Sequence, residues 1–337
     1  MDVDVLQKSR NYDWLLCIFF SVDIEGATAY KTKMRHQNGD EDWCLLFERF
    51  YKEFPGTFDH AYLSLSSSQA PDAITKIIRP TLWKFVGDEI LFYAPLTDPS
   101  QTLEHVRAFR QALIDYNKNI LQQYGVSCKG TVWLAGFPIN NRIVLLDDKH
   151  KDKPIIDFVG ASIDIGFRLT KFSSSRKLVI SLDLLWLLAE SEKDNHEKVY
   201  STFLKDNVKY SGRHELKGVL SDKSYPIFWI DSCAKSPVED DFLPDHKKCN
   251  LNSIITFCEE FSCSVDSSIF VKPFIVGDSA GQIKEDQVRK DFREQRDSLR
   301  TYKEGKSMPT GKDTAPLEKV GSDDSPVDTI RNLKPPV

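Results

Sequence analysis

The sequence predicts an α+β protein, in which helices pack on a mixed and mostly antiparallel sheet. Of its 337 residues, 41% are hydrophobic and 11% aromatic, which is typical of a packed globular core. Segments typical of strands and of helices alternate along the chain. Two apolar segments flank Gly87-Asp88, a turn pair that predicts a tight hairpin, and a hairpin requires antiparallel neighbours.

The first part of the chain carries the strongest strand signal. The apolar segment from Trp14 to Val22, which ends at Asp23, is typical of a strand buried on both faces. A helix is expected over 41–54, where large apolar residues recur at helical spacing. The polar, serine-rich segment 63–70 is expected to form a loop.

The elements after the hairpin complete the expected sheet and its helical cover. In chain order we expect a helix over 99–123, strands over 128–137 and 142–146, a helix over 160–169, a strand over 178–181, a helix over 182–189, and strands over 208–216 and 224–231.

The composition changes after Ser232, and the change predicts three regions. Residues 1–232 form the sheet domain. Residues 240–280 keep enough apolar side chains for a small helix-plus-strand module, which we expect to act as an accessory or sensor region. Residues 281–337 are highly charged, and they predict a helix over 284–302 followed by a disordered tail.

Charge and residue spacing exclude several classes of protein. The net charge of -5 argues against a nucleic-acid binder, whose surface would be basic. The seven cysteines are scattered without a CxxC pair, and the seven histidines show no HxH or HExxH spacing, so no structural zinc site is expected. The longest apolar run is too short to span a membrane, and the N-terminus lacks the apolar core of a signal peptide. We therefore expect a reduced, soluble, cytoplasmic protein.

Two aspartates lie where neighbouring central strands end. Asp23 follows the first strand, and Asp88 lies at the tip of the hairpin. Carboxylates suit hard divalent cations, and a pair of such ions can stabilise both the attacking oxygen and the leaving group of an in-line displacement. Either aspartate alone also fits an ordinary turn or strand end. The surrounding motifs therefore decide between the two interpretations.

The segments SVDIEGAT and KFVGDEILFY resemble the two metal-binding segments of class III nucleotidyl cyclases, an Asp-Ile-x-Gly strand end and a Lys-x-x-Gly-Asp hairpin. The resemblance implies a ferredoxin-like, palm-type catalytic domain. It also implies that Asp23 and Asp88 hold two divalent cations, Mn²⁺ or Mg²⁺, with help from the Ile24 carbonyl. The base-reading lysine of the family falls on Lys84, and we expect Phe20 to contact the substrate as well.

The rest of the family pattern follows in the same order along the chain. The segment DFVGASIDIGFR keeps the spacing of the family's Asp-x-x-Gly-x-x-Val-Asn-x-x-x-Arg run, and ELKG follows it. The resemblance implies that Asp157 contacts the base, Asp164 the ribose, Arg168 the transition state and Lys217 the phosphates. Asp164 and Arg168 are four residues apart, so they share one face of a helix. The match covers roughly residues 14–231.

In class III cyclases one subunit supplies the metal aspartates, and the other supplies the base, ribose and arginine contacts. Because this chain carries both sets, the resemblance implies a head-to-tail homodimer with two shared sites. The 3′-hydroxyl of a nucleoside triphosphate would attack the α-phosphorus and expel pyrophosphate. Catalysis would rest on positioning and charge stabilisation, without a covalent intermediate.

The sequence departs from the family at the ribose-orienting asparagine, which is Asp164 here. An ionised aspartate accepts hydrogen bonds but donates none. The segments KGTVWLAGFPINN and GFRLTKF resemble the bacterial pyrimidine cyclases of Pycsar antiphage systems, which make cyclic CMP or cyclic UMP for a separate effector. We therefore expect UTP or CTP as the substrate. Lys84 and Asp157 suit adenine, cytosine and, with exchanged partners, uracil. Four bulky residues could fill the space of a purine's second ring or simply pack in the core: Tyr51, Phe85, Trp133 and Phe158.

Three other functions stay open. An adenylate cyclase would make cyclic AMP from ATP with the same residues. A diguanylate cyclase is suggested by VGDEILF, but the second glycine of that family's loop is missing and DFVGASIDIGFR has no place in it. A nucleotide-binding sensor without turnover would have no reason to keep the two metal aspartates, the arginine and the lysine.

Overall fold

The computed structural model describes residues 13–38, 41–66, 77–146, 155–194, 203–220, 223–232, 250–265, 269–277 and 282–303. Contacts group Met1–Arg300 into one compact unit and Thr301–Val337 into a second. The disordered tail expected after the last helix lies outside the described residues. The segment 240–280 belongs to the first unit, and its expected accessory or sensor role stays a prediction.

A seven-stranded sheet forms the centre of the first unit, in the order β2-β3-β1-β4-β7-β9-β8. Its strands are β1 (Leu15–Glu25), β2 (Thr81–Val86), β3 (Glu89–Leu96), β4 (Ser127–Phe137), β7 (Lys177–Ile180), β8 (Val208–His214) and β9 (Tyr225–Asp231). All neighbours are antiparallel except β4 and β7, so the predicted mixed, mostly antiparallel sheet is confirmed.

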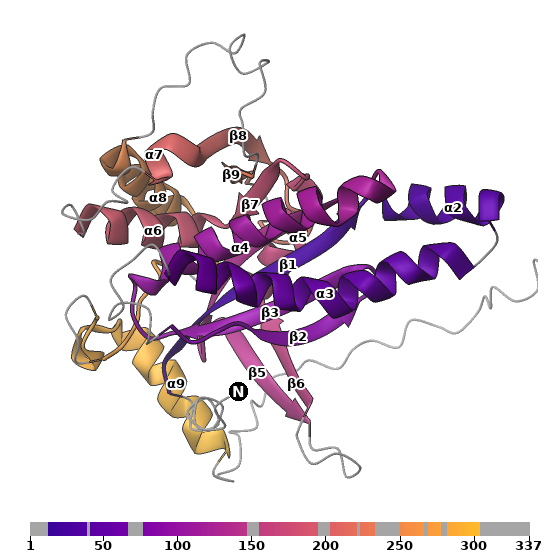
Figure 1. Ribbon diagram of the computed structural model, residues 1–337. Helices are drawn as coiled ribbons and strands as arrows, with labels where there is room; N and C mark the ends of the chain where they lie inside the picture. Colours follow the sequence, from indigo (N-terminus) through magenta and orange to yellow (C-terminus); the bar gives the residue numbers. More distant parts are fainter. Residues whose placement is uncertain are drawn as a thin grey trace, which may run out of the picture. The chain divides into compact units, whose positions relative to one another are not determined.

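Eight α-helices accompany this sheet in the described residues. They are α2 (Ala27–Asn38), α3 (Glu41–Ser66), α4 (Gln101–Asn119), α5 (Ala161–Leu169), α6 (Leu182–Asp194), α7 (Phe203–Asn207), α8 (Leu251–Ser264) and α9 (Lys290–Lys303). Single 3₁₀ turns cover Leu121–Tyr124, Thr170–Phe172 and Glu285–Gln287. Figure 1 shows α3 and α4 side by side along one face of the sheet. The order β2-β3-β1-β4, with helices before β2 and before β4, is a ferredoxin-like arrangement.

Strand β1 separates two apolar clusters, because its side chains alternate between the two faces of the sheet. Ile18 and Phe20 belong to the large cluster beneath the helices, and Phe19 belongs to a smaller cluster on the opposite face. In the smaller cluster the Phe19 ring stacks on Trp133, with 5.6 Å between ring centroids, and meets Phe158 edge-on at 5.0 Å. Both faces of β1 are therefore buried, as the continuous apolar run predicts.

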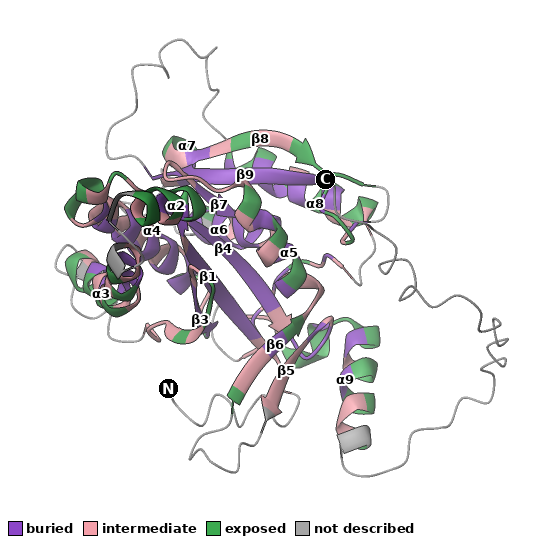
Figure 2. Ribbon diagram, turned by 90° about the vertical axis from the view of Figure 1, so that its right-hand side faces the viewer, coloured by how far each residue is buried: buried purple, intermediate pink, exposed green. Residues whose placement is uncertain are grey.

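A two-stranded hairpin, β5 (Asn141–Leu146) and β6 (Ile155–Gly160), is paired separately from the large sheet. Figure 2 shows it extending beyond the sheet. Gly160 joins β6 to α5 with a φ of 140°, and a Cβ at this position would lie 2.3 Å from the Asn140 carbonyl oxygen. Only glycine fits there, because side chains rarely adopt this φ and there is no room for a Cβ. Helix α5 begins at the next residue, as predicted.

Several elements differ from the sequence predictions. Helix α3 continues to Ser66, so the prediction of a loop is wrong for residues 63–66. Residues 67–70 of that predicted loop lie outside the described residues. The helix passes through Pro55, and the burial of Tyr62 in the large cluster holds its last turns in place. Strand β6 and helices α2 and α7 were not expected. In the described part of 240–280 a helix is present, but no strand.

No helix within the described ranges is both long enough and apolar enough to span a bilayer.

Candidate functional site

The carboxylates predicted to bind metal meet at one end of the central strands. Asp23 lies near the end of β1 and pairs in register with Glu89, the first residue of β3. Asp88 precedes Glu89 in the turn between β2 and β3, where Gly87 adopts a φ of 63°. The Tyr51 hydroxyl of α3 donates a hydrogen bond to the Gly87 carbonyl oxygen and so holds the turn against the helix. Strand register therefore brings the two predicted metal ligands together.

Burial and repulsion both act on the carboxylates of Asp23 and Glu89. Burial raises the pKa of Asp23, and the charge of Asp88 raises it further. The ammonium group of Lys129, 3.4 Å from the Asp23 carboxylate, acts in the opposite direction. Burial also raises the pKa of Glu89, which accepts a hydrogen bond from the Ser21 hydroxyl. Ionised carboxylates are disfavoured here, so a further cation would stabilise the cluster.

The donor set at this end of the strands suits a hard cation. The Asp23 and Asp88 carboxylates offer only oxygen ligands, and the carbonyl of Ile24 lies next to Asp23 in the chain. Within the described residues no group of three or more His, Cys, Asp or Glu side chains is arranged to hold a metal ion. Two carboxylates and a carbonyl are compatible with ions that take their remaining ligands from phosphate and water.

Lys84 and Asp157, the predicted base-reading residues, form an ion pair within the chain. The Lys84 ammonium on β2 lies 2.7 Å from the Asp157 carboxylate on β6. It also lies 4.2 Å from the centroid of the Trp83 ring, a cation–π contact. The side chains are 36% and 41% exposed, so each can exchange its partner for a ligand. The structure thus brings together two residues that are 73 positions apart.

Asp164 and Arg168 are exposed on α5, one helical turn apart. Lys217 is exposed in the turn after β8. Within the described residues, none of these three side chains forms a hydrogen bond or an ion pair. Two cations and one carboxylate are therefore left available for a ligand. Their predicted contacts with ribose and phosphate stay predictions.

Phe20 is placed differently from the other predicted substrate contacts. Its ring is fully buried beneath the helices, with centroids 5.2 Å from Phe58 on α3 and 5.2 Å from Phe109 on α4. In this position the ring packs in the core, and its surroundings give no support for contact with a substrate.

The four bulky residues considered for substrate size divide into two pairs. Trp133 and Phe158 are buried in the smaller apolar cluster, as core packing requires. Tyr51 and Phe85 pack against each other beside the Gly87-Asp88 turn, with 4.8 Å between ring centroids. Phe85 is 47% exposed. Of the four, Phe85 therefore offers the most open aromatic surface near the carboxylates.

Glu89 and Lys129 were missed by sequence reasoning, although both interact with the predicted metal ligands. Glu89 follows Asp88 directly, and its position opposite Asp23 depends on the β1–β3 register. Lys129 pairs with Asp23 across β1 and β4, more than a hundred residues away in sequence. No short sequence motif predicts which residues of β1 and β4 are paired.

Comparisons with known proteins give a distant likeness. No family model matches the chain, and no curated protein matches it either. The chain resembles the crystal structure of the guanylyl cyclase Cya2 with 14% identity and a TM-score of 0.44, over 67% of this chain and 96% of that one. For the adenylyl cyclase CyaB from P. aeruginosa, the identity is 13% and the TM-score 0.45, over 71% and 98% of the two chains. For the guanylate cyclase domain of RhGC from Catenaria anguillulae in complex with GTP, the identity is 15% and the TM-score 0.43, over 65% of this chain and 96% of that one. At such values the case for a function rests on the residues themselves.

Proposed function

We propose that this chain is a nucleotidyl cyclase, which closes a nucleoside triphosphate into its 3′,5′-cyclic monophosphate and releases pyrophosphate. The observation that carries the proposal is the meeting of Asp23 and Asp88 at one end of the central strands, where burial and the charge of Asp88 both raise the pKa of Asp23. A merely structural cluster gains nothing from such repulsion. Perturbed carboxylates of this kind are typical of functional sites.

Asp23, Asp88 and the Ile24 carbonyl would hold the divalent ions. When bound, such ions would lower the pKa of the 3′-hydroxyl and neutralise the triphosphate. The chain's own contribution is to fix the two carboxylates, through the β1–β3 register and the turn that Tyr51 anchors.

Lys84 and Asp157 would read the base. Their ion pair opens when a base enters, because both side chains are partly exposed. With cytosine, Lys84 donates to N3 and Asp157 accepts from the 4-amino group. With uracil, Lys84 donates to O4 and Asp157 accepts from N3–H. The pair therefore serves either pyrimidine.

Residues of α5 and of the turn after β8 would complete the site. Asp164 accepts a hydrogen bond from a ribose hydroxyl, and Lys217 binds phosphate oxygens. Arg168 neutralises the charge that develops on the α-phosphate. The bond from the 3′-oxygen to the α-phosphorus forms while the bond to the β-phosphate's bridging oxygen breaks. The hydroxyl proton passes to solvent, and pyrophosphate leaves.

We propose that two copies of the chain form the catalytic unit, with shared sites. Large apolar side chains exposed on β2 and β6 support an interface there. They are Leu82, Phe85, Val86, Ile155 and Val159, each 41–47% exposed. Edge strand β2 carries three of them. A second copy would cover this surface and bring its own α5 toward the carboxylates.

For the substrate we propose UTP or CTP, with the product acting as the second messenger of a bacterial antiphage system and binding a separate effector protein. The support is the aspartate at position 164, where adenylyl and guanylyl cyclases carry asparagine, and the resemblance of two segments to pyrimidine cyclases. An ATP-using cyclase is the alternative.

The experiment is to incubate the full chain with each of the four ribonucleoside triphosphates and Mn²⁺ or Mg²⁺, and to identify cyclic products by mass spectrometry. We expect cyclic UMP or cyclic CMP. Arg168→Ala should lower turnover by about 10²–10³-fold, as the loss of one charge-stabilising group does. Lys205→Ala, which removes another exposed cation, should leave turnover unchanged.

Turnover of ATP alone would overturn the pyrimidine proposal and leave the cyclase proposal standing. If a folded, dimeric protein gave no cyclic product from any of the four, the cyclase proposal would be wrong.

A further inference from the structure

A cavity of about 220 Å³ lies at the far end of the central strands from the carboxylates. Leu15 and Leu16, at the start of β1, line it, whereas Asp23 lies near the end of that strand. Seven residues of extended chain separate Leu16 from Asp23, which is about 23 Å at the usual rise of a strand. The cavity is therefore distinct from the proposed active site.

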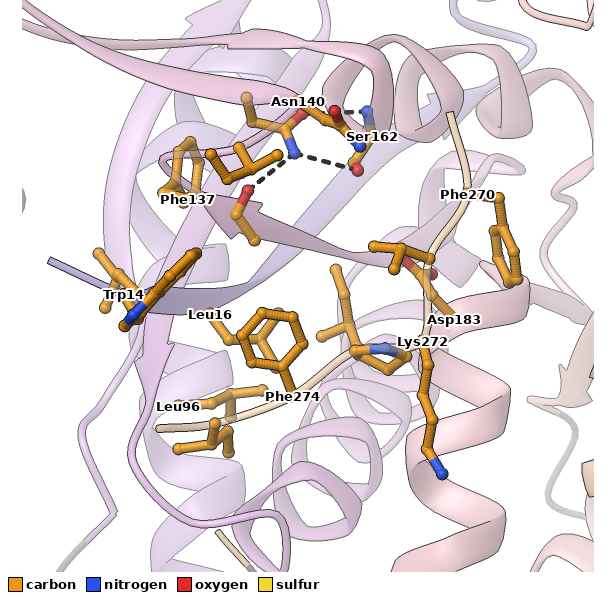
Figure 3. A pocket seen from close by; sticks show the side chains of 18 of the residues that line it. Trp14, Leu16, Leu96, Phe137, Asn140, Ser162, Asp183, Phe270, Lys272 and Phe274 are labelled. Carbon is orange, nitrogen blue, oxygen red and sulfur yellow. Dashed lines mark hydrogen bonds between the residues drawn. The ribbon is translucent and has the colours of Figure 1, made fainter. Parts of the chain in front are cut away.

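The walls of the cavity are mainly apolar and aromatic, as Figure 3 shows. Trp14 and Phe274 meet edge-on, with 5.8 Å between ring centroids, and Phe137 and Phe270 contribute further rings. An engineered apolar cavity of about 150 Å³ binds benzene. A cavity of about 220 Å³ therefore has room for one ring with a short polar arm.

The carboxylate of Asp183 lines the cavity and has no cationic partner among the described residues. Asp183, in the first turn of α6, accepts hydrogen bonds from the Ser181 hydroxyl and from the Leu184 N–H at 2.8 Å. Both donors are neutral, and no side-chain cation pairs with this carboxylate in the part of the chain that the structure describes. Burial raises the pKa of Asp183 to about 6, so the group is ionised at neutral pH.

Lys272, the lysine that also lines the cavity, does not compensate this charge. Its ammonium group pairs with Glu190 and lies 5.3 Å from the centroid of the Trp186 ring. In Figure 3 its side chain points away from the rings that line the cavity. A ligand that brings its own cation would therefore find an unpaired anion, which is costly to leave in apolar surroundings.

Helix α5 joins this cavity to the proposed active site. Ser162 and Ile165 line the cavity, while Asp164 and Arg168 on the same helix are exposed. The start of α5 is fixed by Asn141, whose side-chain oxygen accepts a hydrogen bond from the Ser162 N–H at 3.0 Å. A ligand that packs against Ile165 therefore contacts the helix that carries Arg168, the predicted transition-state arginine.

We propose that the cavity binds a small amine with one apolar ring, whose ammonium group pairs with Asp183 while the ring packs among the aromatic side chains. We propose further that the bound amine changes turnover through α5, a step that rests on the proposed cyclase function. Carboxylic acids are excluded by the charge of Asp183.

The test measures binding to the full chain by calorimetry at neutral pH, with three matched probes: phenethylamine, phenylethanol and phenylpropionate. We expect the amine to bind about tenfold more tightly than the alcohol, which is the typical gain from a charge-assisted hydrogen bond. The acid should not bind. Asp183→Asn keeps the shape of the side chain and an oxygen that accepts the hydrogen bond from the Leu184 N–H. In this variant the affinity for the amine should fall to the affinity for the alcohol.

Two variants separate cavity binding from surface binding. Val271 lines the cavity, so Val271→Trp places a large ring there and should abolish binding of both the amine and the alcohol. Lys205 is exposed and does not line the cavity, so Lys205→Ala should leave both affinities unchanged. Thermal unfolding of each variant reports whether it is folded. Absence of amine binding to the wild-type protein, or equal amine affinity in wild type and a folded Asp183→Asn, would overturn the proposal.

Cyclic nucleotide formation, measured with and without saturating phenethylamine, tests the coupling. A change in turnover that Val271→Trp abolishes supports coupling through α5. Unchanged turnover in the presence of bound amine refutes it. If no triphosphate is turned over at all, the cyclase proposal fails while the calorimetric result for the cavity stands.

Discussion

Two inactive variants of this chain should restore each other's activity if its catalytic sites are shared between subunits. Asp23→Ala removes a predicted metal ligand, and Arg168→Ala removes the predicted transition-state contact. Both residues lie on one chain, and in the described residues Arg168 forms no ion pair within that chain. A shared site would take its aspartates from one copy and its arginine from the other.

The expected recovery follows from the two-fold symmetry of such a dimer. When the two variants assemble at random in equal amounts, half of the dimers contain one copy of each. In each mixed dimer one site has both residues and the other has neither. Activity should therefore return to about a quarter of the wild-type value. Each variant alone should be reduced by about 10²–10³-fold or more.

Co-expression of the two variants with different affinity tags gives the mixed dimers, and chromatography of the nucleotide products measures turnover. The matched control combines Arg168→Ala with Asp164→Ala. Both changes lie on α5, so each site of the mixed dimer carries one defect and no recovery is expected. If purified mixed dimers of Asp23→Ala and Arg168→Ala stay as inactive as either parent, the shared-site proposal is wrong.

Three further predictions concern stability and substrate affinity. Burial lowers the pKa of His105 to about 3. Because an unfolded histidine titrates near 6.5, stability should be lost as the pH falls from there toward 3, by up to about 1.4 kcal/mol per unit. Urea unfolding at several pH values should show a flatter dependence for His105→Gln, and an identical slope would contradict the burial argument. Gly166→Ala places a Cβ 2.2 Å from the Trp133 ring. It should lower the free energy of unfolding by about 1–3 kcal/mol, and an unchanged urea midpoint would disprove the close packing of α5 on β4. Lys84→Ala and Asp157→Ala should each raise KM about tenfold yet change the free energy of unfolding by less than about 1 kcal/mol, since the pair is partly exposed. Unchanged KM in steady-state assays would remove the pair from the substrate site.

Local signals were sufficient for the parts of the fold that depend on neighbouring residues. The Gly87-Asp88 turn and the strand β1 were both predicted correctly. A Gly-Asp pair is typical of a tight turn, and an uninterrupted apolar run is typical of a strand buried on both faces. The length of α3 could not be read in this way. Pro55 and Gly56 disfavour a helix locally, and the burial of Tyr62 in the large cluster beside α4 is a tertiary contact.

The candidate site shows the same division. That Asp23 and Asp88 lie together follows from their positions at the ends of neighbouring strands. The approach of Lys129 depends on the β1–β4 register, which no short motif encodes. For Phe20, strand alternation predicts that it faces away from Phe19, but not which of the two faces the helices cover.

The most direct test of the proposed cyclase is to measure activity and stability together in Asp23→Asn and Asp88→Asn. Asparagine keeps the volume of the side chain but removes one of the charges that repel each other at the end of β1. Because burial and Asp88 raise the pKa of Asp23, Asp23→Asn should be at least as stable as the wild type at pH 7, while cyclic nucleotide formation falls below detection in both variants. Cyclisation at the wild-type rate by either folded variant would contradict the assignment of these two carboxylates to the catalytic site.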